Sequence, residues 1–240
     1  MKYGFLFIIS LIFGCSSTPA SFNKVTADIQ LLKDGTVIYF KGKTSETNVD
    51  ELIKTAEQSS SRISTLIVNS SGGDVYGGMK FGQWVYDQKV KLTVRKLCFS
   101  SCANYIFTAA KEVIVEAGSI VGWHGGSLQK NWNIPWHLNL NPWWKSSFNA
   151  EIAKWQSMES DYFATIGVNQ QITVLGQREL FLSKRTGNGW AFSTRNLEVL
   201  GVTNVFFEDA EPCLSNEEIT VDLIDIEPNR LLSLLRQSDT

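Results

Sequence analysis

The amino-acid sequence predicts an α/β fold in which a mostly parallel sheet is flanked by helices. Stretches rich in β-branched and aromatic residues alternate with stretches that carry apolar residues at helical spacing, and this alternation is typical of βαβ units. The chain has 240 residues, 43% hydrophobic and 19% charged, which suits one such domain with a full core. The net charge of −2 gives no basic surface for nucleic acid, so no nucleic-acid partner is expected.

The N-terminus has the character of an export signal. An apolar run over residues 4–13 follows a lysine and is too short for a comfortable transmembrane helix. A small residue followed by Cys15 then resembles the lipobox of bacterial lipoproteins, although Phe13 departs from that pattern. We therefore expect residues 1–15 to be a signal peptide with a lipobox and Cys15 to carry a lipid anchor to a membrane. We expect residues 16–27 to be a polar tether and the protein to lie in the cell envelope, periplasmic or membrane-anchored.

The first elements of the domain follow the tether. Residues 36–42 are rich in β-branched and aromatic side chains and predict a strand. Residues 48–60 predict a helix that begins at Asn48 or Asp50, because apolar residues recur there at helical spacing. Residues 63–75 predict a buried strand that runs into a glycine turn.

The same alternation continues to residue 126. Residues 77–88 predict a helix, residues 90–97 a strand, and residues 111–126 two short strands. Two loops, at residues 69–78 and 98–104, each follow a strand and enter a helix. In parallel sheets such loops share the edge where ligands bind, so we expect these two loops to lie together.

Tryptophan is concentrated in residues 123–155, which hold six of the eight tryptophans of the chain. The stretch becomes helical from about Pro142 to Ala164. It is either an aromatic loop or handle packed over the core, or an inserted lid, oligomer contact or membrane-facing surface. Residues 211–240 follow as a C-terminal extension with one strand and a short helix.

Several motifs together resemble the family of the Clp protease proteolytic subunit, within the ClpP/crotonase-like group. They are a strand, glycine pair and Tyr-Asp helix over 67–87, the stretch LCFSSCANYIFTAA over 97–110, VGWHGG over 121–126 and WAFSTRNLEVLGVTNV over 190–205. The resemblance implies a spiral of ββα units over residues 28–210, a serine peptidase activity without a cofactor, and self-association into homo-oligomers. The Cys-x-Ser-x-Cys pattern looks like exported relatives of that subunit.

The resemblance places the nucleophile among Ser100, Ser101 and Cys102. Placing Lys96 where the family has a glycine selects Ser100, and this choice best keeps the family's spacing to the histidine, 24 residues. Matching the following alanine pair selects Cys102 instead. We favour Ser100, ahead of Ser101 and Cys102.

A serine becomes a nucleophile only when a base takes its proton and an oxyanion hole receives the negative charge. The resemblance places the base at His124. Backbone N–H groups of Gly72, Gly73 and Ser101 are the expected oxyanion hole, because the glycines lack a Cβ and Ser101 starts a helix. The alternative is that the serines only cap the helix and His124 is structural.

With Cys15 set aside, three cysteines remain. Cys98 and Cys102 are candidates for a disulfide, since an exported compartment permits one and makes a standing thiolate less favourable. A zinc site from these cysteines with His124 and Cys213 is conceivable, but the spacing matches no short zinc motif. No metal is therefore expected.

The acid of a catalytic triad is ambiguous. The motif QRELFLS offers Glu179, but WAFST matches the same family segment and puts Gly189 at the acid position. Asp161 and Glu159 remain alternatives, and without any acid a Ser-His dyad still acts, less efficiently.

The expected function is an exported serine hydrolase that cleaves a peptide or protein substrate in the cell envelope. No ATPase partner is expected, because ATP is not expected outside the cytoplasm. One alternative is a catalytically weak or inactive ClpP-like module used for binding or assembly. Another is a Ser/Lys peptidase resembling signal peptide peptidase, with Lys96 or Lys111 as the base.

Overall fold

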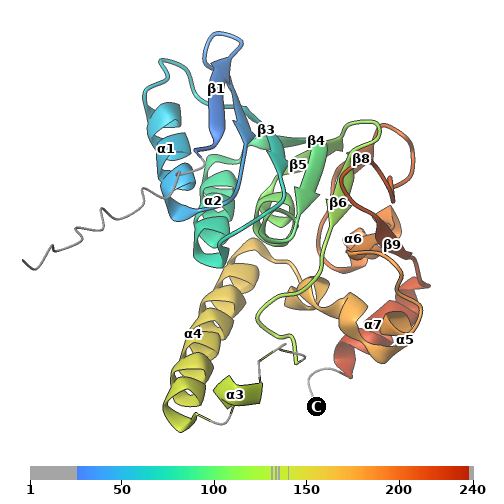
Figure 1. Ribbon diagram of the computed structural model, residues 1–240. Coiled ribbons are helices and arrows are strands. Elements are labelled where there is room, and N and C mark those ends of the chain that lie inside the picture. The colour runs from blue at the N-terminus through green and yellow to red at the C-terminus, as the bar shows by residue number, and fades with distance from the viewer. Residues whose placement is uncertain (1–25, 131, 133, 135, 140, 238–240) are drawn as a thin grey trace, which may run out of the picture.

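The computed structural model describes residues 26–237 apart from residues 131, 133, 135 and 140. The expected signal segment, the lipidation at Cys15 and nearly all of the tether lie outside the described residues. The described chain is an α/β fold whose mixed, mostly parallel sheet is flanked by helices, as predicted (Figure 1).

The main sheet holds seven strands, and all neighbours are parallel except the first pair. Its path runs through β1 (Asp28–Leu32), β2 (Val37–Lys41), β3 (Thr65–Ser70), β4 (Lys91–Phe99), β5 (Glu112–Val115) and β8 (Val205–Phe207), while β6 (Ile120–Gly122) pairs with β4. Strand β1 was not expected from the sequence. It forms an antiparallel hairpin with β2.

Strand β4 is long enough to serve two neighbours in succession. Its first residues, Lys91 to Val94, pair with β5, and its last three residues pair with β6. Between these parts Lys96 has φ 67°, a left-handed backbone that turns the strand from one partner to the other. The end of β4 is thereby placed beside the end of β6.

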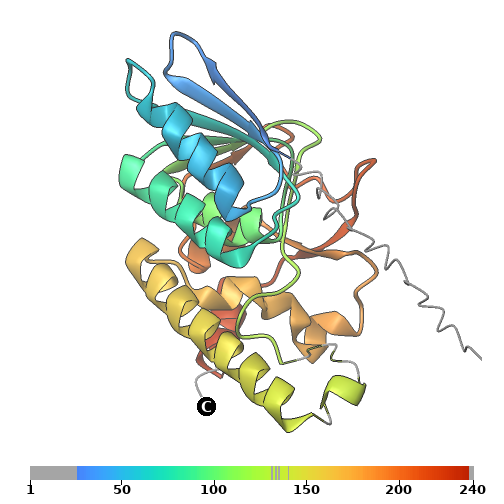
Figure 2. The ribbon, with the colours of Figure 1, turned by 60° about the vertical axis from the view of Figure 1, so that its left-hand side comes forward.

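Helices α1 (Glu46–Glu57) and α2 (Val75–Gln88) lie on one side of the sheet, and α6 (Thr194–Val199) and α7 (Pro228–Arg236) lie on the other (Figures 1 and 2). The first helix begins earlier than expected. Its cap is Ser45, whose side chain accepts the backbone N–H of Asn48. Asn48 itself is 5% exposed and donates to the carbonyl of Lys43.

The tryptophan-rich stretch divides between core and surface. Trp123 is 1% exposed and packs edge-on against Phe107 and Phe192, whereas Trp143 is 77% exposed. The surface part includes α3 (Trp136–Asn139) and the long helix α4 (Pro142–Ile166), which projects below the sheet in Figure 1. No helix within the described residues is long and apolar enough to cross a membrane.

The C-terminal segment belongs to the core. Strand β9 (Val221–Ile224) pairs in parallel with β7 (Gly189–Phe192) in a second, two-stranded sheet, and Leu231 of α7 is completely buried. Short turns connect this part: η2 (Gln170–Thr173), η3 (Leu175–Gln177) and α5 (Glu179–Leu182). The residues expected as an extension thus contribute both a strand and a buried helix face.

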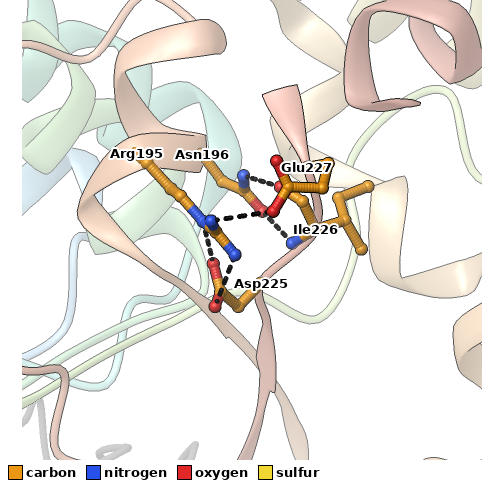
Figure 3. A network of polar contacts seen from close by, with 5 residues as sticks. All are labelled: Arg195, Asn196, Asp225, Ile226 and Glu227. Atoms are coloured by element: carbon orange, nitrogen blue, oxygen red, sulfur yellow. Dashed lines mark hydrogen bonds and ion pairs between the residues drawn. The ribbon is translucent and has the colours of Figure 1, made fainter. Parts of the chain in front are cut away.

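A polar network ties α6 to the chain that follows β9 (Figure 3). Asn196 is completely buried; its amide donates to the carbonyl of Ile226 at 2.7 Å and accepts the N–H of Ile226 at 3.0 Å. Arg195 binds both carboxylate oxygens of Asp225, at 2.7 and 3.0 Å, and contacts Glu227. Asn196 therefore connects α6 to the segment after β9 in the interior, while Arg195 connects the same two segments at the surface.

Candidate active site

Ser100 occupies the turn between the end of β4 and the helical segment η1 (Cys102–Phe107), a π-helix. Its φ is 59°, a left-handed backbone that a serine rarely adopts. Its carbonyl accepts the N–H of Asn104 at 2.8 Å, so the residue starts the helix while its side chain remains outside it. Strained residues and π-helical turns concentrate at functional sites.

His124 is brought to Ser100 by the pairing of β4 with β6. Phe99 lies opposite Gly122, and the N–H of Ser100 donates to the carbonyl of Gly122 at 3.0 Å. His124 follows β6 directly, and its Nε2 lies 2.7 Å from Ser100 Oγ. At this distance the hydroxyl and the imidazole are hydrogen-bonded.

The other two nucleophile candidates are placed differently. Ser101 is 2% exposed, and its hydroxyl donates to the carbonyl of Gly73 at 3.0 Å. Cys102 is completely buried and forms a disulfide with Cys98, so it holds no thiol. Of the three, Ser100 has its hydroxyl against the histidine.

The surroundings of His124 favour its neutral form. Its ring stacks on Phe99, with centroids 5.1 Å apart and 16° between the planes. The side chain is partly exposed, but loss of water on the side that packs against the protein lowers the pKa of His124, and the positive charge of Arg185 lowers it further. The Gln177 amide donates to the His124 carbonyl at 3.0 Å and holds the backbone in place. A neutral imidazole is the form that accepts a proton.

No hydrogen bond or ion pair joins His124 to a carboxylate in the part of the chain that the structure describes. Glu179 is exposed at the start of α5, and Asp161 is exposed on α4. Gly189 lies beside the histidine instead: a Cβ there would be 2.1 Å from the carbonyl oxygen of Trp123. The match of WAFST to the family segment therefore supplies no acid, because it puts Gly189 at that position. The match of QRELFLS puts Glu179 there, and Glu179 is not hydrogen-bonded to the histidine.

Glu159, the remaining acid candidate, has another role. It is completely buried on α4, and its Oε2 accepts the N–H of Ser127 at 3.0 Å and the hydroxyl of Ser127 at 2.6 Å. Gln170 donates to the same oxygen at 2.8 Å, and Tyr105 donates to Oε1 at 2.6 Å. Burial and the nearby carboxylate raise the pKa of Tyr105, which keeps its proton on the phenol. Glu159 thus holds the loop three residues after His124.

The glycine loop between β3 and α2 lies against the Ser100 turn. A Cβ on Gly72 would be 2.5 Å from the Phe99 carbonyl oxygen and 2.7 Å from the Ser101 nitrogen. The Gly72 N–H donates to Ser70 Oγ at 3.1 Å. Within the described chain, the N–H groups of Gly73 and Ser101 make no hydrogen bond. Of the three expected oxyanion-hole donors, these two are free to bind an anion.

The remaining sequence candidates lie apart from this pair. Neither Lys96 nor Lys111 is hydrogen-bonded to Ser100, and the Cys213 thiol contacts the carbonyl of Ser215 at 3.3 Å. Among the described residues, no group of three histidine, cysteine or acidic side chains could hold a metal ion. A cavity of about 600 Å³ lies at the C-terminal ends of α2 and η1, and Ser100 and His124 are not among its lining residues.

No protein-family model matches the chain, and no curated protein matches it. Among solved structures, an asparagine-to-aspartate mutant of ClpP1 from Listeria monocytogenes is similar, with 16% sequence identity and a TM-score of 0.39. The alignment covers 55% of this chain and 71% of that chain. This is a structural similarity to ClpP at low sequence identity; it neither assigns the chain to a family nor bears on activity.

Proposed function

We propose that the protein is a serine hydrolase of the Ser-His dyad type that cleaves peptide bonds. The observation that carries the proposal is the 2.7 Å contact between Ser100 Oγ and His124 Nε2. A nucleophile and its base must lie within about 2.6–3.2 Å of each other. The lowered pKa of His124 supports the role of base, because the ring is neutral near pH 7.

The chemistry follows from the placement of these groups. Ser100 Oγ attacks the carbonyl carbon while its proton moves to His124 Nε2. The N–H groups of Gly73 and Ser101 stabilise the oxyanion of the tetrahedral intermediate. The C–N bond breaks as the imidazolium returns the proton to the leaving amine. Water then releases the acyl group from Ser100 by the same steps. Without a carboxylate to stabilise the imidazolium, we expect slower turnover than a full triad supports.

We also propose that the enzyme works in an oxidising compartment of the cell envelope, anchored through Cys15 and without an ATPase partner. The disulfide between Cys98 and Cys102 supports this, because such bonds persist mainly outside the cytoplasm. Self-association is proposed for the same protein. The exposed Trp143 on the projecting helix supports it, since exposed tryptophans are typical of interfaces.

A second candidate is a weakly active or inactive module used for binding or assembly. One observation favours it, namely that His124 has no carboxylate partner among the described residues. A Ser/Lys mechanism has less support, because the Ser100 hydroxyl contacts a histidine.

The deciding experiment is labelling with an alkyl fluorophosphonate, followed by peptide mass spectrometry under non-reducing conditions. We expect an adduct on Ser100 that is lost in Ser100→Ala and strongly slowed in His124→Ala. His137→Ala is the matched control, because it removes the other histidine, which is exposed on α3. A folded protein that takes no label favours the binding module, and full labelling of His124→Ala contradicts a histidine base.

A further inference from the structure

A cavity of about 280 Å³ lies between α5 and the second sheet, and residues of both β7 and β9 line it. It is lined by aromatic and charged side chains, among them Phe181, Lys184, Arg185, Trp190 and Asp222. Its wall therefore carries two cations and one carboxylate, a positive balance in a protein whose net charge is −2.

The backbone of the cavity wall is joined to the segment that carries His124. Trp190 exchanges two hydrogen bonds of 2.8 Å with Trp123, the residue before His124. The neighbouring Gly189 packs against Phe99, the ring on which His124 stacks. The cavity wall is thus hydrogen-bonded to the residue before His124, and the positive charge of Arg185 acts on the His124 ring.

Arg185 makes no side-chain hydrogen bond or ion pair in the described chain, although the carboxylate of Asp222 lies close enough for the two charges to interact. It is half-buried, and its guanidinium carbon lies 5.8 Å from the centre of the Trp190 ring. The carboxylate on the same wall is otherwise engaged: Asp222 accepts the N–H of Gly187 at 2.9 Å and the hydroxyl of Thr186 at 2.9 Å. No ion pair joins Asp222 to Arg185 there, so the guanidinium keeps its donors for a ligand.

Trp190, which lines the cavity, carries a donor that is unsatisfied. Trp190 is 1% exposed, and its indole N–H is buried without a hydrogen-bond partner in the described structure. Because that N–H is enclosed by the protein, the Arg185 guanidinium is the donor that this wall offers to a ligand that accepts hydrogen bonds.

We propose that this cavity is a substrate subsite that binds a carboxylate, the side chain of an acidic residue near the cleaved bond, through Arg185. This inference rests on the proposed hydrolase function, since it names the substrate class of the same site. The guanidinium lies over the Trp190 ring and presents its donors in a planar fork, the geometry that suits a carboxylate. Lys184, exposed at the rim, adds a second positive charge.

The test measures binding without chemistry, so that it does not depend on catalysis. Ser100→Ala protein is titrated with blocked tetra-alanine peptides in which Glu or Gln occupies each position in turn, and binding is followed by saturation-transfer NMR. At one position we expect the Glu peptide to bind about five- to tenfold more tightly than the Gln peptide, as for a charge-assisted contact. The preference should shrink as salt is added.

Substitutions in the same background identify the cation. Arg185→Gln should reduce the Glu preference below about twofold, and Arg185→Lys should keep part of it because the charge remains. Lys54→Gln is the matched control, because it removes one charge from the exposed face of α1 and should keep the full preference. Equal binding of both peptides at every position, or a preference that survives Arg185→Gln, overturns the proposal. If the wild-type protein takes no fluorophosphonate label, the proposed hydrolase function is contradicted. The measured preference for the Glu peptide does not depend on that result.

Discussion

Replacement of Glu159 by leucine tests how much the hydrogen bonds of this buried carboxylate contribute to stability. The carboxylate accepts four hydrogen bonds in a completely buried position, from Tyr105, Gln170 and twice from Ser127. Two of these donors have an alternative. The Ser127 hydroxyl can rotate, and the Gln170 amide also lies 3.2 Å from that hydroxyl. The Ser127 N–H and the Tyr105 hydroxyl would be left buried and unpaired.

Each unpaired buried donor costs about 1–3 kcal/mol, so two cost about 2–6 kcal/mol. Leucine also removes the penalty of burying a charge, which offsets part of that cost. We expect Glu159→Leu to lose about 3 kcal/mol of unfolding free energy, or roughly 10 °C in Tm for a domain of this size. Glu159→Gln keeps one acceptor oxygen, and its amide can donate to Tyr105, so it should lose about 1 kcal/mol.

The assay is urea and thermal unfolding followed by circular dichroism. Asp161→Asn is the control, because Asp161 is exposed on the same helix and should change stability by less than about 0.5 kcal/mol. If Glu159→Leu is as stable as the wild type, the four hydrogen bonds contribute nothing net and the reasoning is refuted.

Three further outcomes are expected. Labelling of Ser100 should lose rate in acid with a midpoint below pH 6.5, because burial and Arg185 lower the pKa of His124 and only the neutral ring accepts a proton; a midpoint above 6.5 would contradict this. Gly72→Ala should reduce the labelling rate at least about tenfold in a protein that still folds, because its φ is 83° and its Cβ would lie 2.8 Å from the Ser100 Cβ; unchanged labelling would show that this loop does not shape the site. Asn196→Ala should lose about 1–3 kcal/mol in urea unfolding, because it leaves the half-buried N–H and carbonyl of Ile226 without their partner, and a loss under about 0.5 kcal/mol would be the opposite result.

The alternation of strand and helix was readable from the sequence because buried parallel strands and amphipathic helices have distinct patterns. The same rule predicted that the loops after β3 and β4 meet, and in the structure Gly72 lies against Ser100. Strand β1 escaped prediction because its alternation of polar and apolar residues lasts only from Asp28 to Leu31, which is too short to stand out from the tether before it. Its residues are mostly exposed, and it forms through its pairing with β2.

The two residues of the site that lie in local sequence motifs were predictable. Ser100 and His124 lie on segments whose strands pair directly, so their spacing along the chain was informative. Two motif matches left the acid undecided, because only the pairing of Trp190 with Trp123 shows which segment comes beside the histidine. The role of Glu159 depends on a contact across 32 residues, which no local pattern encodes.

The close approach of β7 to the residue before His124 limits how this site can be changed by evolution or by design. A carboxylate cannot be added at Gly189, because any side chain there would displace the carbonyl oxygen that binds Trp190 across the two strands. An acid for the histidine would have to come from another segment, and the loop that carries Gln177 already contacts the His124 backbone. Directed evolution that aims to speed up the proposed hydrolysis should therefore begin at the segment that carries Gln177.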